Sequence, residues 1–376
     1  MAQSFDTAVV GAGVLGLAHA YHLAKQGQRV VVFERSPQAV GASIRNFGML
    51  WPIGQTAGEM YAMAIRSREI WLEALQQSGI WHERTGSLHL AYHEDEEQVL
   101  REFAAEASHS GYQCALLTPA QIQERSRAVH PDGLRAGLWS PTEVCVDPPT
   151  TIASLPGYLT RQYGVTFHFD TAVTACGDGM LLAGGHEWRA ERLYVCGGDD
   201  FQTLFPDVLQ SSGMIRCKLQ MLRSQPMEGR WRLGPMLAAG LTLRHYKSFQ
   251  NCPSLSALKQ RVAAETPLYD RYGIHVMASQ NGKGELVLGD SHEYDADISP
   301  FDKSEIDALI LDYLQTFLRT PDLRIASRWH GVYAKHPTEP YLVLHPTANT
   351  TVVTGVGGAG MTLSFGLAER VVNGTL

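Results

Sequence analysis

Three glycines near the start of the chain have a spacing that suits phosphate binding: Gly11, Gly13 and Gly16 of the segment GAGVLG. The first glycine of such a turn permits a sharp change of direction, the second lets a pyrophosphate approach the backbone, and the third lets a helix pack close to the sheet. Glu34 follows Gly16 by eighteen residues, about where a carboxylate accepts hydrogen bonds from an adenosine ribose. We therefore expect a bound dinucleotide with free ribose hydroxyls. The alternative is a glycine turn in an α/β fold whose crevice binds nothing.

A second glycine-rich loop, at 355–360, lies near the other end of the chain. A β-branched segment precedes it and a helix-like segment follows it to residue 373. The N-terminus of a helix carries about half a positive charge, which would stabilise the anion of a reduced flavin ring. A nicotinamide enzyme usually keeps its cofactor on one Rossmann domain, whereas this chain returns to the cofactor at its far end. We therefore expect a flavin; the alternative is a second tight turn whose glycines serve packing.

The elements that must position these loops follow from the apolar pattern. Apolar segments at 8–10 and 30–33 flank a helix-like stretch, which predicts a βαβ unit around the first turn. The other expected helices lie at 59–78, 94–108 and 303–318, and a strand followed by a proline-started helix is expected at 114–125. Strands are expected at 87–92, in short segments over 165–182 and, buried, in 191–200, and a proline-rich crossing between domains is expected at 137–150. The middle third, at about 217–325, is expected to be rich in strands, including 241–246, 273–280 and 284–295.

Composition narrows the class of protein. A chain of 376 residues with 44% hydrophobic and 18% charged residues is typical of a soluble globular protein of two domains. The net charge of −7 without a basic block argues against nucleic acid or an anionic membrane as a partner, and no apolar stretch reaches the length of a transmembrane segment. The first strand begins too close to Met1 for a secretory signal, so we expect a cytoplasmic protein. No metal site is expected, since the six cysteines show no CxxC pair, although a zinc site from scattered Cys and His is a weak alternative.

Six further segments occur in a family-specific order: ASIRNFGML at 42–50, GLWSPTEVCVDP at 137–148, YVCGG at 194–198, GELVLGD at 284–290, WHGVY at 329–333 and GVGGAGMTLS at 355–364. Together with GAGVLG and Glu34, they make the whole chain resemble the FAD-dependent amine oxidases of the D-amino acid oxidase, glycine oxidase and sarcosine oxidase type. The segment SIRNFGMLWPIGQ resembles the corresponding segment of a bacterial subgroup of this family that is associated with aminophosphonate breakdown.

The resemblance implies an α/β fold of mixed α+β character, with a Rossmann-like FAD-binding domain and a discontinuous substrate domain on a large mixed β-sheet. The FAD domain would comprise 1–80, 145–216 and 326–376, and the substrate domain 81–144 and 217–325. Val173 would meet adenine through its backbone, and 358–362 would face the pyrimidine edge. The implied cofactor-binding residues are Gly11, Gly13, Val14, Leu15, Gly16, Glu34, Arg35, Ser43, Arg45, Asn46, Gly48, Met49, Val173, Gly197, Gly331, Gly357, Gly358, Ala359, Gly360, Met361 and Thr362.

Three positions depart from the relatives. Gly331 stands where sarcosine oxidase has the cysteine that bonds to the flavin, which predicts non-covalent FAD through this route. Tyr333 replaces the arginine that grips the substrate carboxylate in D-amino acid and glycine oxidases, and Thr362 replaces a carboxylate-holding lysine of sarcosine oxidase. An acidic group entering a dry pocket without a cation is costly. Another cation is therefore expected, and the candidate substrate-binding residues are Arg45, Lys335, His275 and His292, with Trp51 and Tyr333 as walls.

Each candidate also has a structural interpretation. Arg45 suits a FAD phosphate, Lys335 suits a solvated surface, the two histidines suit hydrogen-bonded strand positions, and the two aromatics suit core packing. A phosphonate, which is bulkier and more charged than a carboxylate, would use several donors together. The sequence leaves these alternatives open.

The resemblance implies oxidation of the C–N bond of a small acidic amine by hydride transfer to flavin N5. The resulting imine hydrolyses to an aldehyde plus amine or ammonia, and O2 is reduced to H2O2. We expect no dedicated catalytic base, because the flavin carries the chemistry. The leading substrate is 2-aminoethylphosphonate or its N-methyl derivative. The alternatives are glycine, sarcosine or a D-amino acid, a flavin dehydrogenase that uses a quinone or an electron-transfer protein, and a flavoprotein whose cofactor is structural. The oligomeric state stays open.

Overall fold

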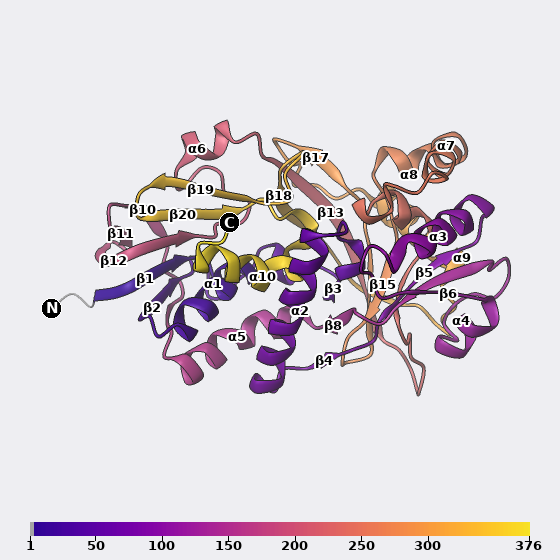
Figure 1. The fold of residues 1–376 in the computed structure, drawn as a ribbon, viewed down its shortest axis with the longest axis horizontal. Helices are drawn as coiled ribbons and strands as arrows, with labels where there is room; N and C mark the ends of the chain where they lie inside the picture. The colour runs from indigo at the N-terminus through magenta and orange to yellow at the C-terminus, as the bar shows by residue number, and fades with distance from the viewer. Residues whose placement is uncertain (1–3) are drawn as a thin grey trace.

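Two large sheets, one in each half of the molecule, organise the fold (Figure 1). The structure, a computed structural model, describes residues 4–376. One half holds an eight-stranded sheet built from residues 4–33, 166–195 and 342–354, and the other holds a nine-stranded sheet built from residues 87–140 and 215–335. This is the mixed α/β architecture expected from the sequence.

The first βαβ unit is confirmed. β1 (Ser4–Val10) leads into α1 (Val14–Lys25), and β2 (Val30–Phe33) returns parallel to β1, with Thr7 opposite Val30. All residues of α1 from Val14 to Ala24 are buried, because the helix lies between the sheet and the helices that cover it. This burial fixes the glycine turn at the carboxyl end of β1.

The remaining strands of the eight-stranded sheet bring the C-terminal glycine loop to the same edge. β9 (Thr166–His168) pairs with β2, and β12 (His186–Val195) pairs with β1, both in parallel. β20 (Thr350–Thr354) continues the parallel set beside β12. Antiparallel strands complete the sheet: β10 (Val173–Gly177), β11 (Met180–Ala183) and β19 (Leu342–Thr347). Since β1, β12 and β20 are parallel neighbours, the loops that leave β1 and β20 emerge on one side.

Helices cover this sheet and join its two ends. α10 (Gly360–Asn373) packs against both α1 and α2 (Glu59–Ser78), and the three lie together in Figure 1. The indole of Trp71 on α2 donates a hydrogen bond of 2.8 Å to the Met361 carbonyl at the start of α10. α5 (Pro148–Tyr163) packs on α1, and the short α6 (Pro206–Ser211) precedes β13. In the part of the chain that the structure describes, no helix has the length and apolar character needed to cross a membrane.

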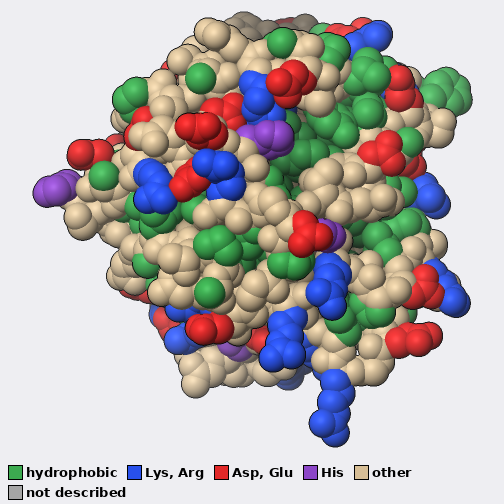
Figure 2. All heavy atoms as spheres, turned by 90° about the vertical axis from the view of Figure 1, so that its right-hand side faces the viewer, with side chains coloured by type: hydrophobic (Ala, Val, Ile, Leu, Met, Phe, Trp, Pro, Cys, Tyr) green, Lys and Arg blue, Asp and Glu red, His purple; other side chains and the backbone are tan. Residues whose placement is uncertain are grey.

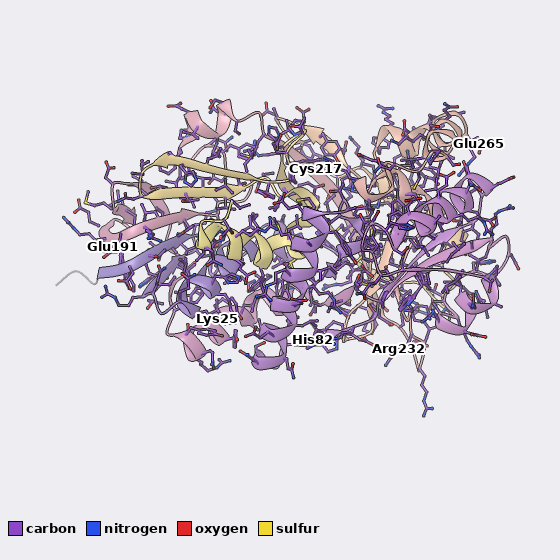
Figure 3. All side chains as sticks on the ribbon, in the orientation of Figure 1. Lys25, His82, Glu191, Cys217, Arg232 and Glu265 are labelled. Carbon is purple, nitrogen blue, oxygen red and sulfur yellow. The ribbon has the colours of Figure 1, made fainter. Side chains whose placement is uncertain are left out.

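The nine-stranded sheet is antiparallel except where β14 (Met236–Ala238) runs parallel to β5 (Ser87–Ala91). Its order is β17-β13-β16-β15-β14-β5-β7-β6, and β18 (Ile325–Lys335) pairs along the length of β13 (Ile215–Pro226). Figure 3 shows Cys217 of β13 near the junction of the two halves, with Glu191 and Glu265 toward opposite ends. The other strands and the helices of this half are β6 (Ala115–Leu117), β7 (Ala136–Ser140), β15 (Met277–Gln280), β16 (Glu285–Gly289), β17 (Glu293–Asp295), α3 (Glu94–Ala107), α4 (Pro119–Arg125), α7 (Leu255–Glu265), α8 (Pro267–Arg271) and α9 (Ser304–Phe317).

A three-stranded sheet marks the crossing between the halves. β8 (Val144–Val146) pairs with β3 (Met49–Leu50) on one side and with β4 (His82–Glu83) on the other. The proline-rich crossing predicted at 137–150 therefore contains the end of β7 and all of β8. The domain boundaries stay a prediction; the pairing of β18 with β13 joins 326–335 to the nine-stranded sheet.

Two sequence-based expectations in the middle third are wrong. The segment 241–246 is not a strand: its start lies in the 3-10 helix η3 (Gly240–Arg244). Alternating Leu241 and Leu243 suggested a strand, but both are buried in a core beside α7, and alternation cannot separate the two conformations in so short a segment. The strand expected at 273–280 is confined to β15, and the strand-rich region also contains α7 and α8.

Candidate functional site

One cavity of about 720 Å³ is lined by both glycine loops. Its walls also come from the 39–56 segment, β13, β18 and the loop after β12. Thus the two distant glycine turns, which the sequence suggested would share a ligand, open onto the same space.

The first glycine turn shapes one wall through backbone groups. Gly11 has φ +97°, and a Cβ there would lie 2.5 Å from the Cys196 carbonyl oxygen. The Ala12 amide donates to the Glu34 carboxylate at 2.9 Å, and the Val14 amide donates to the Ser43 hydroxyl at 2.9 Å. These bonds hold the Ser43 hydroxyl, which can still donate its own proton, beside the N-terminus of α1, where a diphosphate is expected.

The loop with the 3-10 helix η1 (Ala42–Ile44) forms the adjoining wall. The Asn46 amide donates to the Ala42 and Ser43 carbonyl oxygens at 3.0 Å, which holds the loop in shape. Arg45 donates to the His330 carbonyl oxygen at 3.2 Å. Because this bond leaves other guanidinium donors available, Arg45 remains a candidate for binding an anion.

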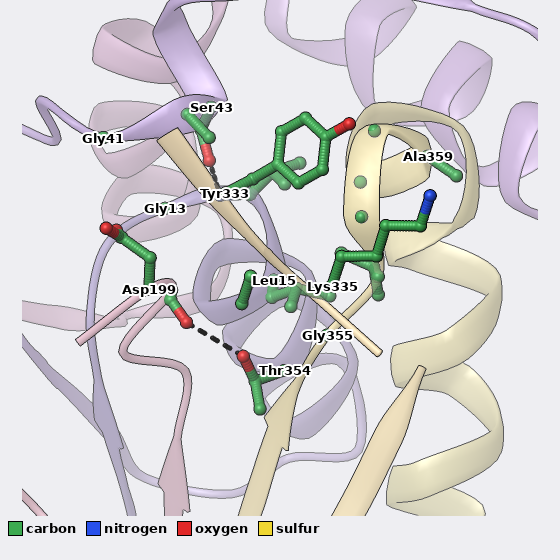
Figure 4. A pocket seen from close by; sticks show the side chains of 18 of the residues that line it. Gly13, Leu15, Gly41, Ser43, Asp199, Tyr333, Lys335, Thr354, Gly355 and Ala359 are labelled. Carbon is green, nitrogen blue, oxygen red and sulfur yellow. Dashed lines mark hydrogen bonds between the residues drawn. The ribbon is translucent and has the colours of Figure 1, made fainter. Parts of the chain in front are cut away.

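The second glycine loop, the 3-10 helix η5 (Gly357–Ala359), leads directly into α10. Figure 4 shows Tyr333 and Lys335 of β18 pointing toward this loop. A Cβ on Gly358 would lie 3.5 Å from the Tyr333 hydroxyl, and one on Gly357 would lie 3.7 Å from Lys335 Cγ. The Thr362 hydroxyl accepts a hydrogen bond of 2.9 Å from the Trp51 amide. The loop thus leaves a narrow space bounded by a helix N-terminus, an aromatic ring and an ammonium group.

The structure brings nearly all the predicted site residues to this cavity, and two lie outside its lining. A Cβ on Gly16 would lie 1.9 Å from the Gly11 carbonyl oxygen, so this glycine serves helix–strand packing as expected. Gly48 has φ +72° and approaches the Val146 carbonyl oxygen, so its role is to shape the loop rather than to face the cavity. The predicted residues that line it are Gly11, Gly13, Val14, Leu15, Glu34, Arg35, Ser43, Arg45, Asn46, Met49, Trp51, Val173, Gly197, His275, His292, Gly331, Tyr333, Lys335, Gly357, Gly358, Ala359, Gly360, Met361 and Thr362.

A polar cluster of three histidines and an aspartate also lines the cavity: His245, His275, His292 and Asp290. The His275 Nε2 atom lies 3.1 Å from the Asp290 Oδ1 atom. Burial lowers the pKa of His292 to about 3, and lowers the pKa values of His245 and His275 well below the usual histidine value. Because burial disfavours the charged imidazole, a cationic role for His275 and His292 is unfavourable in the free protein and stays a prediction.

Sequence reasoning missed His245 and Asp290 as members of this cluster. His245 ends the η3 segment, and Asp290 follows β16, so neither is close in sequence to its partners except His292. The rings of His245 and His275 are 4.0 Å apart, and those of His245 and His292 are 4.4 Å apart. No spacing motif could have predicted a cluster that the tertiary fold assembles from three segments.

Lys335 supplies a positive charge beside the cluster. Burial lowers the pKa of its ammonium group below the usual lysine value. Its Nζ atom donates to the Tyr294 hydroxyl at 3.1 Å and lies 4.6 Å from the centre of that ring. A partly desolvated ammonium group gains more from an incoming anion than a solvated one does.

The comparisons with known proteins settle the family. The model of the family described as "FAD dependent oxidoreductase" matches residues 6–373. The chain belongs to this family. Its cofactor is therefore FAD, and the protein is an FAD-dependent oxidoreductase.

The oxidoreductase is similar to glycine oxidase from Geobacillus kaustophilus, with 27% identity over 214 residues that cover 53% of this chain and 55% of that protein. It is 28% identical over 177 residues to mitochondrial dimethylglycine dehydrogenase from Rattus norvegicus, covering 45% of this chain and 20% of that protein. The matched regions thus span about half of the first relative and a fifth of the second. The crystal structure of the Geobacillus kaustophilus glycine oxidase superposes with a TM-score of 0.77 and 20% identity, covering 98% of this chain and 94% of that one. That likeness shows the fold.

The residues of the cavity fit FAD. The glycines leave backbone surfaces that a side chain would obstruct: a Cβ on Gly13 would lie 3.1 Å from Ser43 Oγ, and one on Gly331 would lie 3.2 Å from the Arg45 carbonyl oxygen. The Glu34 carboxylate lies on the cavity wall at the end of β2, where a ribose would meet it. Two helix N-termini, those of α1 and α10, line the same space, and each favours negative charge. FAD, when bound, supplies the two-electron acceptor.

The chain's own residues then have positioning tasks. The start of α10 places a positive potential at the wall formed by 357–362. Trp51 is 3% exposed and Tyr333 is 8% exposed, so their rings exclude water from the adjoining space. Lys335 offers an ammonium donor at one edge. This arrangement suits a small ligand with an anionic end, held against the flavin-binding loop.

We propose that the FAD is not covalently attached. Gly331 offers no thiol, and the sulfur of Cys196, which also lines the cavity, lies 3.8 Å from His19 Nδ1 on α1. Burial raises the pKa of Cys196 to about 12, so this thiol is a poor nucleophile. Acid precipitation is expected to leave the yellow colour in the supernatant, as judged by its visible absorbance. A yellow pellet that withstands washing in denaturant would contradict the proposal.

Proposed function

We propose that this oxidoreductase oxidises the C–N bond of a small acidic amine, with 2-aminoethylphosphonate or its N-methyl derivative as the leading substrate. The products would be an aldehyde plus ammonia or the amine, and O2 would be reduced to H2O2. The similarity to glycine oxidase and dimethylglycine dehydrogenase supports an amine that carries an acidic group. The domain division at 1–80, 145–216 and 326–376 against 81–144 and 217–325, and a cytoplasmic location, remain predictions within this proposal.

One observation carries the choice of acidic group. The side chains of Tyr333 and Thr362, at the positions where relatives hold a carboxylate with a cation, are uncharged, and both line the cavity. A positive group near the 357–359 loop is the Lys335 ammonium, which points toward it (Figure 4); Arg45 and Lys247 also line the cavity. The Tyr333 hydroxyl adds a neutral donor beside Gly358. A cation with neutral donors nearby suits a phosphonate, which has three acceptor oxygens, better than a carboxylate alone.

The deciding experiment compares substrates on the FAD-loaded protein. We expect kcat/KM for 2-aminoethylphosphonate or its N-methyl derivative to exceed the values for glycine, sarcosine and D-alanine. Peroxide and aldehyde formation in air are the readouts. Higher kcat/KM with the carboxylates would overturn the aminophosphonate assignment while leaving amine oxidation intact.

The dimethylglycine dehydrogenase similarity favours a second candidate, a dehydrogenase that passes electrons to a quinone or a protein. Flavin bleaching by substrate under argon, followed by recovery in air, separates the two. Recovery within the turnover time indicates an oxidase. Recovery that is slower than bleaching by orders of magnitude, and that an artificial quinone accelerates, indicates a dehydrogenase.

A further inference from the structure

The three histidines and the aspartate of the polar cluster converge from three segments of the substrate half. His245 follows η3, His275 precedes β15, and Asp290 and His292 follow β16. One ligand atom from each histidine lies within 4.8 Å of the other two. Both Asp290 and His275 are buried, with 4% and 3% exposure. The fold therefore gathers three imidazoles and a carboxylate in one desolvated place.

Three buried polar atoms of this cluster lack the partners that buried groups normally have. Both ring nitrogens of His275 and the Oδ1 atom of Asp290 have no hydrogen bond of acceptable geometry among the described residues. The 3.1 Å separation of His275 Nε2 and Asp290 Oδ1 is therefore a close approach without a proper hydrogen bond. Buried unsatisfied polar atoms cost about 1–3 kcal/mol each, and such a group in a folded protein calls for an explanation such as a bound ion.

We propose that His245, His275 and His292, with Asp290, bind a divalent transition-metal ion, with zinc as the metal to test first. Three imidazoles that keep an open coordination position are typical of zinc sites that contact a ligand. The Asp290 carboxylate balances part of the charge and orients His275, which leaves the fourth coordination position open. In a tetrahedral zinc site, two nitrogens at about 2.0–2.1 Å from the metal lie about 3.4 Å apart. Metal binding therefore draws the ligand nitrogens, which lie within 4.8 Å of one another, together by up to about 1.4 Å.

Neighbouring charges are compatible with a cation. The Arg244 guanidinium near His245 is paired with Asp270 at 2.7 Å, which neutralises it. Lys335, the other neighbouring positive group, donates from its Nζ atom to the Tyr294 hydroxyl. The Nδ1 atom of His292 lies 3.2 Å from the Gly273 carbonyl oxygen, so donation of this N–H leaves Nε2 as the metal-binding nitrogen. Such a backbone partner is common for metal-binding histidines.

The position of the proposed metal ion would let it contact the substrate. All four residues line the same cavity as the 357–362 loop and Tyr333, and the His292 and Tyr333 rings are 6.5 Å apart. An open coordination position would accept an oxygen of an anionic substrate, and so supply positive charge that Tyr333 and Thr362 do not. This part of the inference rests on the proposed function, whereas metal binding itself does not.

Metal content of the tag-free, FAD-loaded protein tests the proposal. After incubation with excess zinc and removal of unbound metal, we expect about one zinc per chain by elemental analysis. The zinc absorption edge should report three nitrogen ligands at about 2.0–2.1 Å. The variants H245Q and H275Q should retain less than about a tenth of that zinc, as expected when a ligand of a tetrahedral site is lost. His245 is the least buried of the three histidines, so H245Q is the variant more certain to fold.

The matched control is H186Q, since His186 is exposed at the start of β12 and lies outside the cavity lining. It should bind zinc like the wild type. Failure of the wild type to retain zinc, or equal retention by H245Q and H275Q, overturns the proposal. Zinc binding with no oxidation of acidic amines would leave the metal site in place and refute the proposed function. Oxidation of acidic amines by zinc-free protein, with unchanged KM, would refute the substrate role of the metal.

Discussion

The variant G16A is expected to lose FAD and to have a lower free energy of unfolding than the wild type. A Cβ on Gly16 would lie 1.9 Å from the Gly11 carbonyl oxygen and 3.0 Å from the Gly11 carbonyl carbon. Both atoms are backbone, so α1 must move away from β1 to admit the methyl group. Overpacking of this kind typically costs about 1–3 kcal/mol, and the displaced helix no longer aims its N-terminal amides at the expected diphosphate position. We expect the purified variant to be colourless and to melt several degrees below the wild type.

Two alanine variants separate folding from cofactor binding. G13A places its Cβ 3.1 Å from the Ser43 hydroxyl, which is the end of a side chain that can shift. The apoprotein of G13A should therefore melt like the wild-type apoprotein, while its FAD affinity falls because the methyl group occupies the diphosphate approach. G177A serves as the matched control, since a Cβ there meets nothing within 4 Å. Stoichiometric FAD in G16A with an unchanged melting temperature would refute this account of the turn.

The sequence predicts this part of the fold well because local and tertiary requirements agree there. The apolar segments at 8–10 and 30–33, the glycines between them and Glu34 all serve one turn, so a single pattern carries the information. The same holds for the 350–373 segment and for α2, whose observed bounds, Glu59–Ser78, match the expected range. An element is predictable from the sequence where its local propensity, its apolar pattern and its tertiary packing all favour the same structure.

The part of the cavity around the histidine cluster is not predictable from the sequence in the same way. The histidine cluster comes from separate segments, and two of them, 241–246 and 273–280, were assigned the wrong local structure in whole or in part. Burial disfavours the charged forms of His275 and His292, and burial is a property of the tertiary fold. Lys335 was identified through its place in β18, but its direction toward the glycine loop required the structure. The resemblance therefore predicts which residues line the cavity better than it predicts how burial alters their pKa values.

The distribution of charged side chains on the surface bears on where the protein recognises its ligands. Figure 2 shows basic and acidic side chains interspersed over the face at the right-hand end of Figure 1, the half that holds the nine-stranded sheet, without a stripe of one sign. This distribution agrees with the expectation from the net charge of −7. Recognition is therefore expected inside the cavity, where the partly buried Lys335 ammonium is poorly screened by salt.

Removing the charge of Lys335 is expected to weaken the binding of anionic ligands by about 10- to 100-fold, the value of a charge-assisted hydrogen bond of about 1.5–3 kcal/mol. Lys335 is half-buried on β18, and burial lowers its pKa. An anion bound beside it favours the charged form and so raises that pKa again. The affinity is therefore highest while the ammonium group is protonated. It falls as the pH rises through the lowered pKa, at a lower pH than for an ordinary lysine.

Acetate is the suitable probe for the pH profile, because it carries no amine and stays a monoanion throughout the range; methylphosphonate, whose second ionisation falls near neutral pH, is compared between variants at one fixed pH. The dissociation constant of acetate, followed through the flavin absorbance, should rise with pH in the wild type. In K335M both anions should bind weakly at neutral pH, and the alkaline rise for acetate should be lost. K335R should restore affinity without the alkaline rise, since a guanidinium stays charged. K259M, at an exposed position of α7, should behave like the wild type. Equal affinities of K335M and K259M for methylphosphonate would exclude Lys335 as the anion-binding group and would leave the cation to Arg45 or to the proposed metal ion.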